Sequence, residues 1–231
     1  MPPTATIPYG PDPEQVADLW LPASDGLHPG VVLVHGGCWR AQYGRDLEDR
    51  VAADLAARGL AVWNVEYRRL DCGGEWPVPL EDVVAAVAAL PEGIDRARLA
   101  LAGHSAGGHL ALLAANRVQV RGVLAQAPVC NLRLAAELGA CAGSVERLLE
   151  RGAPSPIDEP PGVDVLLVHG DADRHVSVEL SRGYARGGHA VYVELVGCGH
   201  MEHLDPESEA GRLAGNWLET VSYTHLTLPT N

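Results

Sequence analysis

The feature that most constrains the fold is an apolar segment that runs into a glycine-rich turn with a serine at its apex. The segment reads Leu99-Ala-Leu-Ala, the turn reads Gly103-His-Ser-Ala-Gly107, and a stretch rich in Ala and Leu follows. This order predicts a buried strand, a tight turn and a helix, with Ser105 between strand and helix. A helix start with Ser105 as its N-cap is the competing interpretation, because such a short motif is weak by itself.

Strands and helices alternate along most of the chain. Short apolar runs predict strands at 15–21, 31–34, 60–65, 99–102, 120–127, 163–168 and 190–196, after an extended lead-in at 1–15. Amphipathic or Ala- and Leu-rich segments predict helices at 46–58, 79–90, 106–116, 144–151, 177–186 and 206–219. We therefore expect an α/β fold with a doubly wound, mainly parallel sheet whose first strand runs antiparallel. A small insertion at 131–161 stands in place of a large lid.

Length and composition restrict the class of protein. The chain has 231 residues, of which 47% are hydrophobic and 20% charged, and this fits one globular domain, expected at 1–220. The net charge of −13 argues against nucleic acid and membrane surfaces as partners and disfavours strongly anionic substrates, although a local site can override it. Five cysteines without a C-x-x-C pair, and an N-terminus without a signal-peptide pattern, predict reduced thiols and a cytoplasmic location. The oligomeric state stays open, a homodimer included.

The last residues, 221–231, lack helical periodicity and follow the last predicted helix. They look like the translation of a transposon adapter used to prepare sequencing libraries, so we leave them out of the predicted fold. An ordinary disordered tail is the alternative interpretation.

Polar residues that could perform nucleophilic catalysis follow three of the predicted strands. A serine hydroxyl becomes a good nucleophile when a histidine accepts its proton and a carboxylate orients that histidine. Ser105, Asp173 and His200 occur in this order, each just after a strand, and the carboxyl ends of parallel strands meet at one edge of a sheet. Asp171 is the alternative acid and His203 the alternative base. A solvated loop acid and a surface histidine remain the non-catalytic interpretations.

The loop after the strand at 31–34 could stabilise negative charge on a substrate. It reads His35-Gly-Gly-Cys-Trp39, and its two glycines can turn backbone N–H groups inward. We expect the N–H groups of Gly37, Cys38 and Ala106 to form an oxyanion hole. A plain tight turn is the alternative for this loop, and an inert buried thiol is the favoured interpretation of Cys38.

The histidines and glycines do not match the motifs of a metal site or a phosphate loop. Ten histidines are present, but there is no H-E-x-x-H sequence and no Cys/His pairing at zinc spacing. The glycine-rich turn lacks the lysine of a phosphate loop. We therefore expect neither a metal nor a cofactor, and we expect His104 and His109 to serve packing and helix-end hydrogen bonds.

Taken together, these residues resemble the α/β-hydrolase superfamily, and within it small esterases of the feruloyl/acetyl esterase and kynurenine formamidase (arylformamidase) type. The motifs that carry the resemblance lie at 35–39, 66–69, 76–77, 103–110, 169–173 and 199–200. The resemblance implies Ser105 as nucleophile, Asp173 as acid, His200 as base, and an oxyanion loop at Gly37 and Cys38. Cysteine at position 38 is a mild departure from the formamidase-like pattern.

The resemblance also implies the reaction, a serine hydrolase that cleaves a small carboxylic ester or an aryl formamide through an acyl-enzyme. The expected partner is a small-molecule ester or amide substrate. Trp39 and Trp76 are candidate residues of the substrate pocket, with core packing as an equally good interpretation. A small-peptide peptidase and a non-catalytic ligand-binding protein on the same fold remain alternatives, because a fold does not determine a function.

Overall fold

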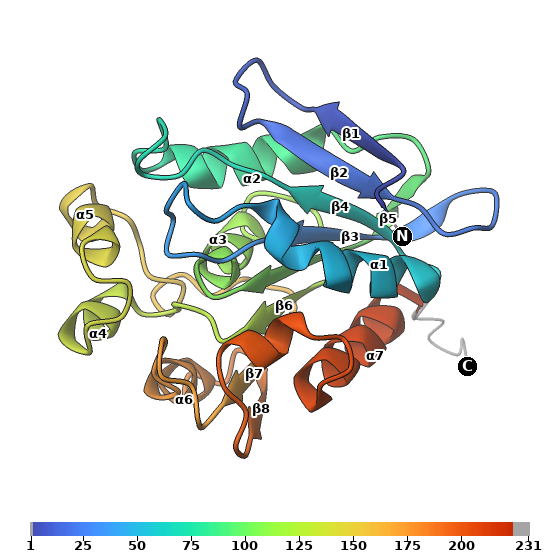
Figure 1. Ribbon diagram of the computed structural model, residues 1–231. Helices are drawn as coiled ribbons and strands as arrows, with labels where there is room; N and C mark the ends of the chain where they lie inside the picture. Colours follow the sequence, from blue (N-terminus) through green and yellow to red (C-terminus); the bar gives the residue numbers. More distant parts are fainter. Residues whose placement is uncertain (1, 224–231) are drawn as a thin grey trace, which may run out of the picture.

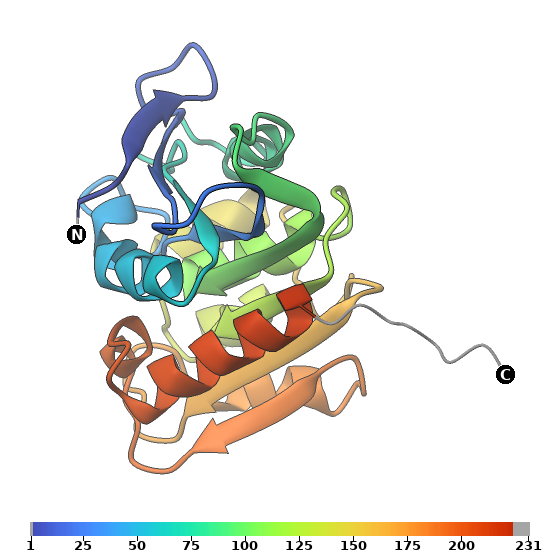
Figure 2. The ribbon, with the colours of Figure 1, turned by 90° about the vertical axis from the view of Figure 1, so that its right-hand side faces the viewer.

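The computed structural model describes residues 2–223, which form one eight-stranded sheet with helices on both faces (Figure 1; Figure 2). The strands are β1 (Ala5–Pro8), β2 (Val16–Trp20), β3 (His28–Val34), β4 (Ala61–Val65), β5 (Ile94–His104), β6 (Gly122–Gln126), β7 (Asp164–Gly170) and β8 (Val191–Leu195). The α-helices are α1 (Asp49–Ala57), α2 (Val78–Ala88), α3 (Ala106–Ala114), α4 (Leu132–Glu137), α5 (Ser144–Glu150), α6 (Glu179–Ala185) and α7 (Glu209–Tyr223). Two short 3-10 helices, η1 (Arg45–Glu48) and η2 (Met201–Leu204), complete the described elements.

The strand order of the sheet is β1-β2-β4-β3-β5-β6-β7-β8. β1 and β2 pair antiparallel, β2 also pairs antiparallel with β4, and all pairs from β4 to β8 are parallel. This confirms the predicted α/β fold with a mainly parallel, doubly wound sheet. Since the parallel strands point the same way, the loops that follow β3, β5, β7 and β8 lie along one edge of the sheet.

The two faces of the sheet bury separate hydrophobic clusters because side chains alternate along each strand. In β5, Leu99 and Leu101 pack with α2 and α3, whereas Ala100 and Ala102 pack with α1 and α7. The central strands β3, β4 and β6 are buried along their whole length, which explains why they appear in the sequence as mainly apolar runs. None of the helices in residues 2–223 combines the length and apolarity needed to cross a bilayer.

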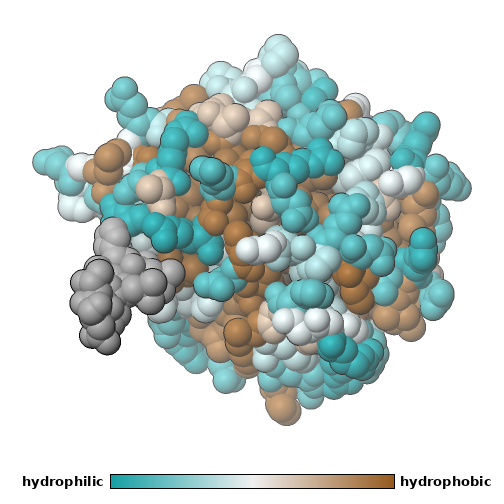
Figure 3. Space-filling view, turned by 180° about the vertical axis from the view of Figure 1, so that it is seen from behind, coloured by the Kyte–Doolittle hydropathy of each residue, from teal (hydrophilic) through white to brown (hydrophobic). Residues whose placement is uncertain are grey.

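Hydrophobic residues also reach the outer surface of the molecule. Figure 3 shows the rear face, where hydrophobic patches are interspersed with hydrophilic side chains. Val191 in the edge strand β8 is 67% exposed, and Val196 just after it is 89% exposed. Apolar atoms make up much of the surface of ordinary folded proteins, so this mixture does not identify an interface.

The structure corrects several predicted boundaries. The lead-in at 1–15 contains the short edge strand β1, which alternates between half-buried and exposed residues and so lacks the signal of a buried strand. The insertion contains α4 as well as the predicted α5. The last helix, predicted to end at 219, continues to Tyr223, with Val221 half-buried and Ser222 buried, so it includes the first residues of the tail that we left out of the predicted fold. Residues 224–231, the remainder of that tail, lie outside the described residues.

Candidate active site

Ser105 occupies a strained turn between β5 and α3. Its φ is 55° and its ψ is −117°, a left-handed conformation that residues with a side chain seldom adopt. A Cβ atom on Gly107 would lie 1.9 Å from the carbonyl oxygen of Val34, and one on Gly103 would lie 2.3 Å from the carbonyl oxygen of Gly107. Only glycine fits at these two positions, so the pattern of small residues around Ser105 follows directly from the geometry of the turn.

Backbone hydrogen bonds hold this turn against the neighbouring strand. The N–H of Ser105 donates to the carbonyl of Gln126 at 2.8 Å, and the carbonyl of Ser105 accepts from the N–H groups of Val129 and His109, each at 3.2 Å. The next residue, Ala106, begins α3, and the first N–H groups of a helix have no partner within the helix. This supports the predicted role of Ala106 as a donor to an oxyanion.

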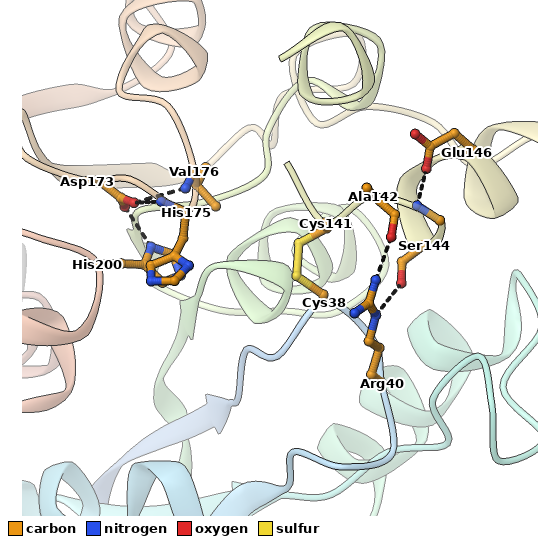
Figure 4. Close-up of a disulfide and its surroundings, with 11 residues drawn as sticks. Cys38, Arg40, Cys141, Ala142, Ser144, Glu146, Asp173, His175, Val176 and His200 are labelled. Atoms are coloured by element: carbon orange, nitrogen blue, oxygen red, sulfur yellow. Dashed lines mark hydrogen bonds and ion pairs between the residues drawn. A yellow bond between two sulfur atoms is a disulfide. The ribbon is translucent and has the colours of Figure 1, made fainter. Parts of the chain in front are cut away.

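An acid–base pair forms between the loops that follow β7 and β8. The Nδ1 of His200 donates to the Oδ2 of Asp173 at 2.6 Å (Figure 4). The other carboxylate oxygen, Oδ1, accepts the backbone N–H groups of His175 at 2.8 Å and Val176 at 2.9 Å. Because Nδ1 of His200 carries the hydrogen, its Nε2 has a lone pair with which to accept a proton.

His169 contacts the carboxylate of Asp173, a role that the sequence analysis did not predict. Its Nε2 lies 3.2 Å from Oδ2 of Asp173 and 3.0 Å from the carbonyl of Val176, and both are acceptors, so we assign the ring hydrogen to Nε2. Its Nδ1 then accepts from the hydroxyl of Ser181 at 2.7 Å. Burial tends to raise the pKa of Asp173, but the hydrogen bonds from His169 and His200 outweigh it and hold that pKa well below its usual range.

The structure separates the predicted acid and base from their alternatives. Asp171 lies on the surface, where its Oδ1 accepts the N–H of Gly197 at 2.6 Å and so ties the end of β7 to the end of β8. His203 is 1% exposed, and neither of its ring nitrogens has a hydrogen-bond partner among the described residues. Burial lowers the pKa of His203 to about 3, so this ring is neutral and remote from proton transfer. The geometry therefore favours Asp173 and His200.

Two further histidines pack as structural residues near the turn. His104 donates from Nε2 to the backbone carbonyl of His200 at 3.0 Å, and the two rings lie 4.4 Å apart. His109, on α3, donates to the carbonyl of Pro154 at 3.1 Å. These contacts agree with the packing and hydrogen-bonding roles expected for both. Within residues 2–223, no group of three or more His, Cys, Asp or Glu side chains is arranged to hold a metal ion.

Ser105 and His200 open onto the same cavity. It has a volume of about 310 Å³, and its wall includes Ser105, His200, Gly37, Cys38, Tyr43 and Arg174. This volume is at the lower end of the range of small-molecule sites. Arg174 is the only Arg, Lys, Asp or Glu among the described residues that line it. The cavity thus brings together the predicted nucleophile, base and oxyanion loop.

The oxyanion loop has an unusual backbone. Gly37, Cys38 and Trp39 have successive φ values of 102°, 54° and 53°, and runs that include left-handed residues can turn adjacent N–H groups toward one point. A Cβ atom on Gly37 would lie 2.3 Å from the Cβ of Tyr43, so only glycine fits there. At the start of the loop, Nε2 of the buried His35 ring lies 2.7 Å from the carboxylate oxygen Oε1 of Glu66.

The two candidate pocket tryptophans do not line this cavity. Trp39 is fully buried, and its ring packs edge-on against His109 at 5.2 Å. Trp76 is half-buried against the same hydrophobic cluster, with its ring 5.9 Å from His109. Both therefore take the alternative role of core packing, and neither contributes to the wall of the cavity beside Ser105.

The prediction that all five cysteines are reduced was wrong. Cys38 and Cys141 form a disulfide that joins the oxyanion loop to the insertion (Figure 4). Both residues also line the cavity. Their separation of 103 residues explains the error, since no local spacing signals such a pair. Cys72, Cys130 and Cys198 are free thiols.

Comparisons with known proteins agree with this fold. The family model BD-FAE matches residues 17–128, and the model of the prolyl oligopeptidase family matches residues 75–186. A solved carbohydrate esterase from gut microbiota superposes with a TM-score of 0.78 and 19% identity, over 96% of this chain and 98% of that one. The chain has the α/β-hydrolase fold.

Two curated relatives of this chain are enzymes. Esterase LipC of Mycobacterium tuberculosis is 29% identical over 83% of this chain and 58% of its own length. Kynurenine formamidase of Meyerozyma guilliermondii is 32% identical over 46% of this chain and 40% of its own length. These relatives confirm the resemblance to esterases and formamidases. The chain spans only about half the length of each of them.

Proposed function

We propose that this α/β-hydrolase is a serine esterase that cleaves a small carboxylic ester through an acyl-enzyme. The observation that carries the proposal is one cavity lined by both Ser105 and His200, with His200 hydrogen-bonded to Asp173 at 2.6 Å. The similarity to named esterases supports the same conclusion. The small cavity favours substrates with a small acyl group.

In the proposed mechanism, the Oγ of Ser105 attacks the carbonyl carbon while Nε2 of His200 accepts the hydroxyl proton. Asp173 holds the tautomer of His200 and stabilises the imidazolium that forms. The carbonyl oxygen becomes an oxyanion, to which the N–H groups of Gly37, Cys38 and Ala106 donate. His200 then gives its proton to the departing alcohol, and a water molecule hydrolyses the acyl-enzyme by the same route in reverse.

Aryl formamides are the second candidate substrates. The similarity to a kynurenine formamidase favours them, and the same residues would attack a formyl carbonyl and protonate an amine as it leaves. A panel of short-chain p-nitrophenyl esters, acetylated sugars, feruloyl esters and N-formylkynurenine, assayed side by side, separates the two classes. The larger kcat/KM identifies the substrate class. Hydrolysis of small peptides alone would favour the peptidase alternative instead.

Replacement of the nucleophile tests the proposal. Ser105→Ala is expected to lower kcat for p-nitrophenyl acetate by about 10⁶-fold, as loss of a catalytic serine does elsewhere, and to abolish labelling by a fluorophosphonate. Ser24→Ala is the matched control, because Ser24 is exposed in the turn before β3. Unchanged labelling of Ser105→Ala would refute the assignment. A native protein that neither labels nor turns over any ester would support the non-catalytic alternative.

We also propose a small-molecule substrate as the partner of this protein, and its cellular location needs a separate test. The net charge of −13 supports a small-molecule substrate over nucleic acid. The three free cysteines fit the predicted cytoplasmic location, whereas the disulfide between Cys38 and Cys141 tells against it, because disulfides persist mainly in oxidising compartments. Fractionation of the source cells decides this point, and recovery outside the cytoplasmic fraction would overturn the cytoplasmic assignment.

A further inference from the structure

The disulfide lies at the point where two distant segments meet over the cavity. Cys38 belongs to the oxyanion loop after β3, and Cys141 belongs to the insertion between α4 and α5, with their Cα atoms 5.3 Å apart. Figure 4 shows the disulfide between the acid–base pair on one side and Arg40 on the other. Both cysteines line the same cavity as Ser105. A covalent bond therefore connects a proposed oxyanion donor to an element that carries no triad residue.

The oxyanion loop is held firmly at its two ends. At its start, the hydroxyl of Tyr67 donates to the carbonyl of His35 at 3.0 Å, and the His35 ring contacts Glu66. At its end, the carbonyl of Trp39 accepts the N–H of Leu70 at 2.9 Å, and the Trp39 ring is buried in the core. The peptide groups between these ends carry the proposed oxyanion donors, and two bonds within the loop act on them: His35 Nδ1 donates to the carbonyl of Gly36 at 2.7 Å, and the N–H of Arg40 donates to the carbonyl of Gly37 at 3.0 Å. Both bonds are local to the loop, so neither ties the donors to another element.

The middle of the loop needs an additional constraint because its backbone is strained. Cys38 has a φ of 54° and its disulfide partner Cys141 has a φ of 52°, conformations that a residue with a Cβ atom retains only when its surroundings enforce them. Beside the disulfide, the hydrogen bonds that join loop and insertion in the described chain come from Arg40, to the carbonyl of Ala142 at 2.5 Å and to the hydroxyl of Ser144 at 3.3 Å. Arg40 lies beyond Trp39, so among these bonds between loop and insertion the disulfide is the one made by Cys38 itself.

We infer that Cys141 is a positioning residue, which acts through its disulfide to hold the N–H groups of Gly37 and Cys38 toward the oxyanion. This inference rests on the proposed function. A dithiol reductant would reverse it: its thiolate attacks one sulfur of the disulfide, a mixed disulfide forms, and the second thiol displaces the protein thiolate. The protein then gains two electrons and two protons as two thiols, and the reductant becomes a cyclic disulfide. The reduced enzyme would have a loosened oxyanion hole and a lower kcat.

The experiment compares oxidised and reduced full-length protein. Dithiothreitol is removed by gel filtration before the assay, because thiols cleave p-nitrophenyl esters themselves, and active sites are counted with a fluorophosphonate. We expect kcat per titrated site for p-nitrophenyl acetate to fall by about 10- to 100-fold, less than complete loss of one oxyanion donor. KM should change less than about twofold, since the donors act on the transition state. Reoxidation should restore kcat.

Two sets of variants isolate the disulfide from other thiols. Cys141→Ala should have the low kcat of the reduced enzyme and should not respond to dithiothreitol. Cys38→Ala keeps the backbone N–H, so the double variant should be no slower than either single variant if Cys141 acts only through Cys38. Cys72→Ala and Cys198→Ala, which remove free thiols, should retain the response of the native protein.

The affinity for a trifluoromethyl ketone distinguishes a disulfide that positions the oxyanion donors from one that only stabilises the fold. Its serine adduct carries an oxyanion, so its Ki should rise in parallel with the fall in kcat/KM. If the disulfide only stabilised the fold, reduction would lower the number of titrated sites and the urea midpoint but leave kcat per site and Ki unchanged. That result would overturn the inference. If the oxidised protein neither hydrolysed esters nor labelled, the proposed function itself would fail, and this inference with it.

Discussion

The two sides of the cavity are held together by different kinds of interaction. On the acid–base side, Asp173 receives hydrogen bonds from His200, His169 and two backbone N–H groups. Every one of these bonds involves a charged carboxylate, and such bonds are roughly twice as strong as neutral ones. Their strength depends on the charge state of the partners. This side is therefore sensitive to any change that removes the carboxylate charge or a histidine hydrogen.

On the oxyanion side, backbone geometry replaces charge. The loop at 37–39 has positive φ angles, and it is held by the close approach of Gly37 to Tyr43 and by the disulfide of Cys38. Its proposed function requires N–H groups in a given direction, and no side chain of the loop itself performs chemistry. The two sides should therefore lose activity under different conditions. The acid–base side should lose it when a charge is altered, and the oxyanion side when the backbone moves.

The largest effect should come from removing the carboxylate charge. Asp173→Asn is expected to lower kcat for p-nitrophenyl acetate by about 10⁴-fold, because an amide no longer holds His200 in the tautomer that accepts a proton. Asp171→Asn is the matched control, since Asp171 contacts the N–H of Gly197 on the surface and not His200. Steady-state kinetics checks both. Equal losses in the two variants would mean that the acid has been misassigned.

A smaller effect should follow from moving the backbone on the other side. Gly37→Ala places a Cβ atom 2.3 Å from that of Tyr43, so the loop must shift and one oxyanion donor should be lost. We expect kcat to fall by about 10²- to 10³-fold with little change in KM. Gly152→Ala has the same positive φ problem, at 75°, but its Cβ atom meets nothing within 4 Å. A loss of activity in both variants would point to general destabilisation.

The same contrast explains what could be predicted from the sequence. Ser105, Asp173 and His200 each follow a strand of a parallel sheet, and the topology alone brings strand ends to one edge, so their order along the chain was informative. The glycines at 103 and 107 could also be interpreted from the sequence, because so tight a turn excludes a Cβ atom at both positions.

Interactions that depend on contacts between distant segments could not be predicted. The disulfide joins residues 103 positions apart, and an odd number of cysteines suggested that none was paired. The support of Asp173 by His169 depends on a turn after β7 that brings residues four positions apart together outside any helix. Trp39 lies next to the oxyanion residues, yet its side chain points into the core, and sequence proximity does not reveal that direction.

The acid–base side should also lose stability on acidification. Burial, with the charges of His169 and His200, lowers the pKa of His203 to about 3, whereas an unfolded histidine has a pKa of about 6.5. Below about pH 6.5 the unfolded state therefore binds a proton that the folded state does not, and the free energy of unfolding falls as the pH falls. His203 alone should contribute about 1.4 kcal/mol per pH unit down to about pH 4, with no effect above about pH 7.

Urea denaturation at several pH values measures this slope. His203→Gln should reduce the pH dependence of the unfolding free energy by that amount, whatever it does to stability at neutral pH. His189→Gln is the control, because His189 is exposed whereas His203 is buried. A slope that is identical in the native protein and in His203→Gln would contradict the neutral, buried state of His203.

The smallest effect concerns the exposed rim of the cavity, which belongs to neither side of the site. Arg174 is exposed, and it is the only Arg, Lys, Asp or Glu among the described cavity-lining residues, in a chain with a net charge of −13. Arg174→Gln should lower kcat/KM for 4-acetoxybenzoate by about 1.5- to 5-fold, the range of exposed ion pairs, and leave the neutral 4-acetoxybenzamide unaffected. High ionic strength should remove the difference, because salt screens exposed charges.

Arg117→Gln is the control. It makes the same change of net charge on the surface after α3, and it should leave kcat/KM unchanged for both substrates. If both substrates slow equally in Arg174→Gln, then Arg174 shapes the cavity rather than selecting charge, and it belongs with the backbone-held side of the site.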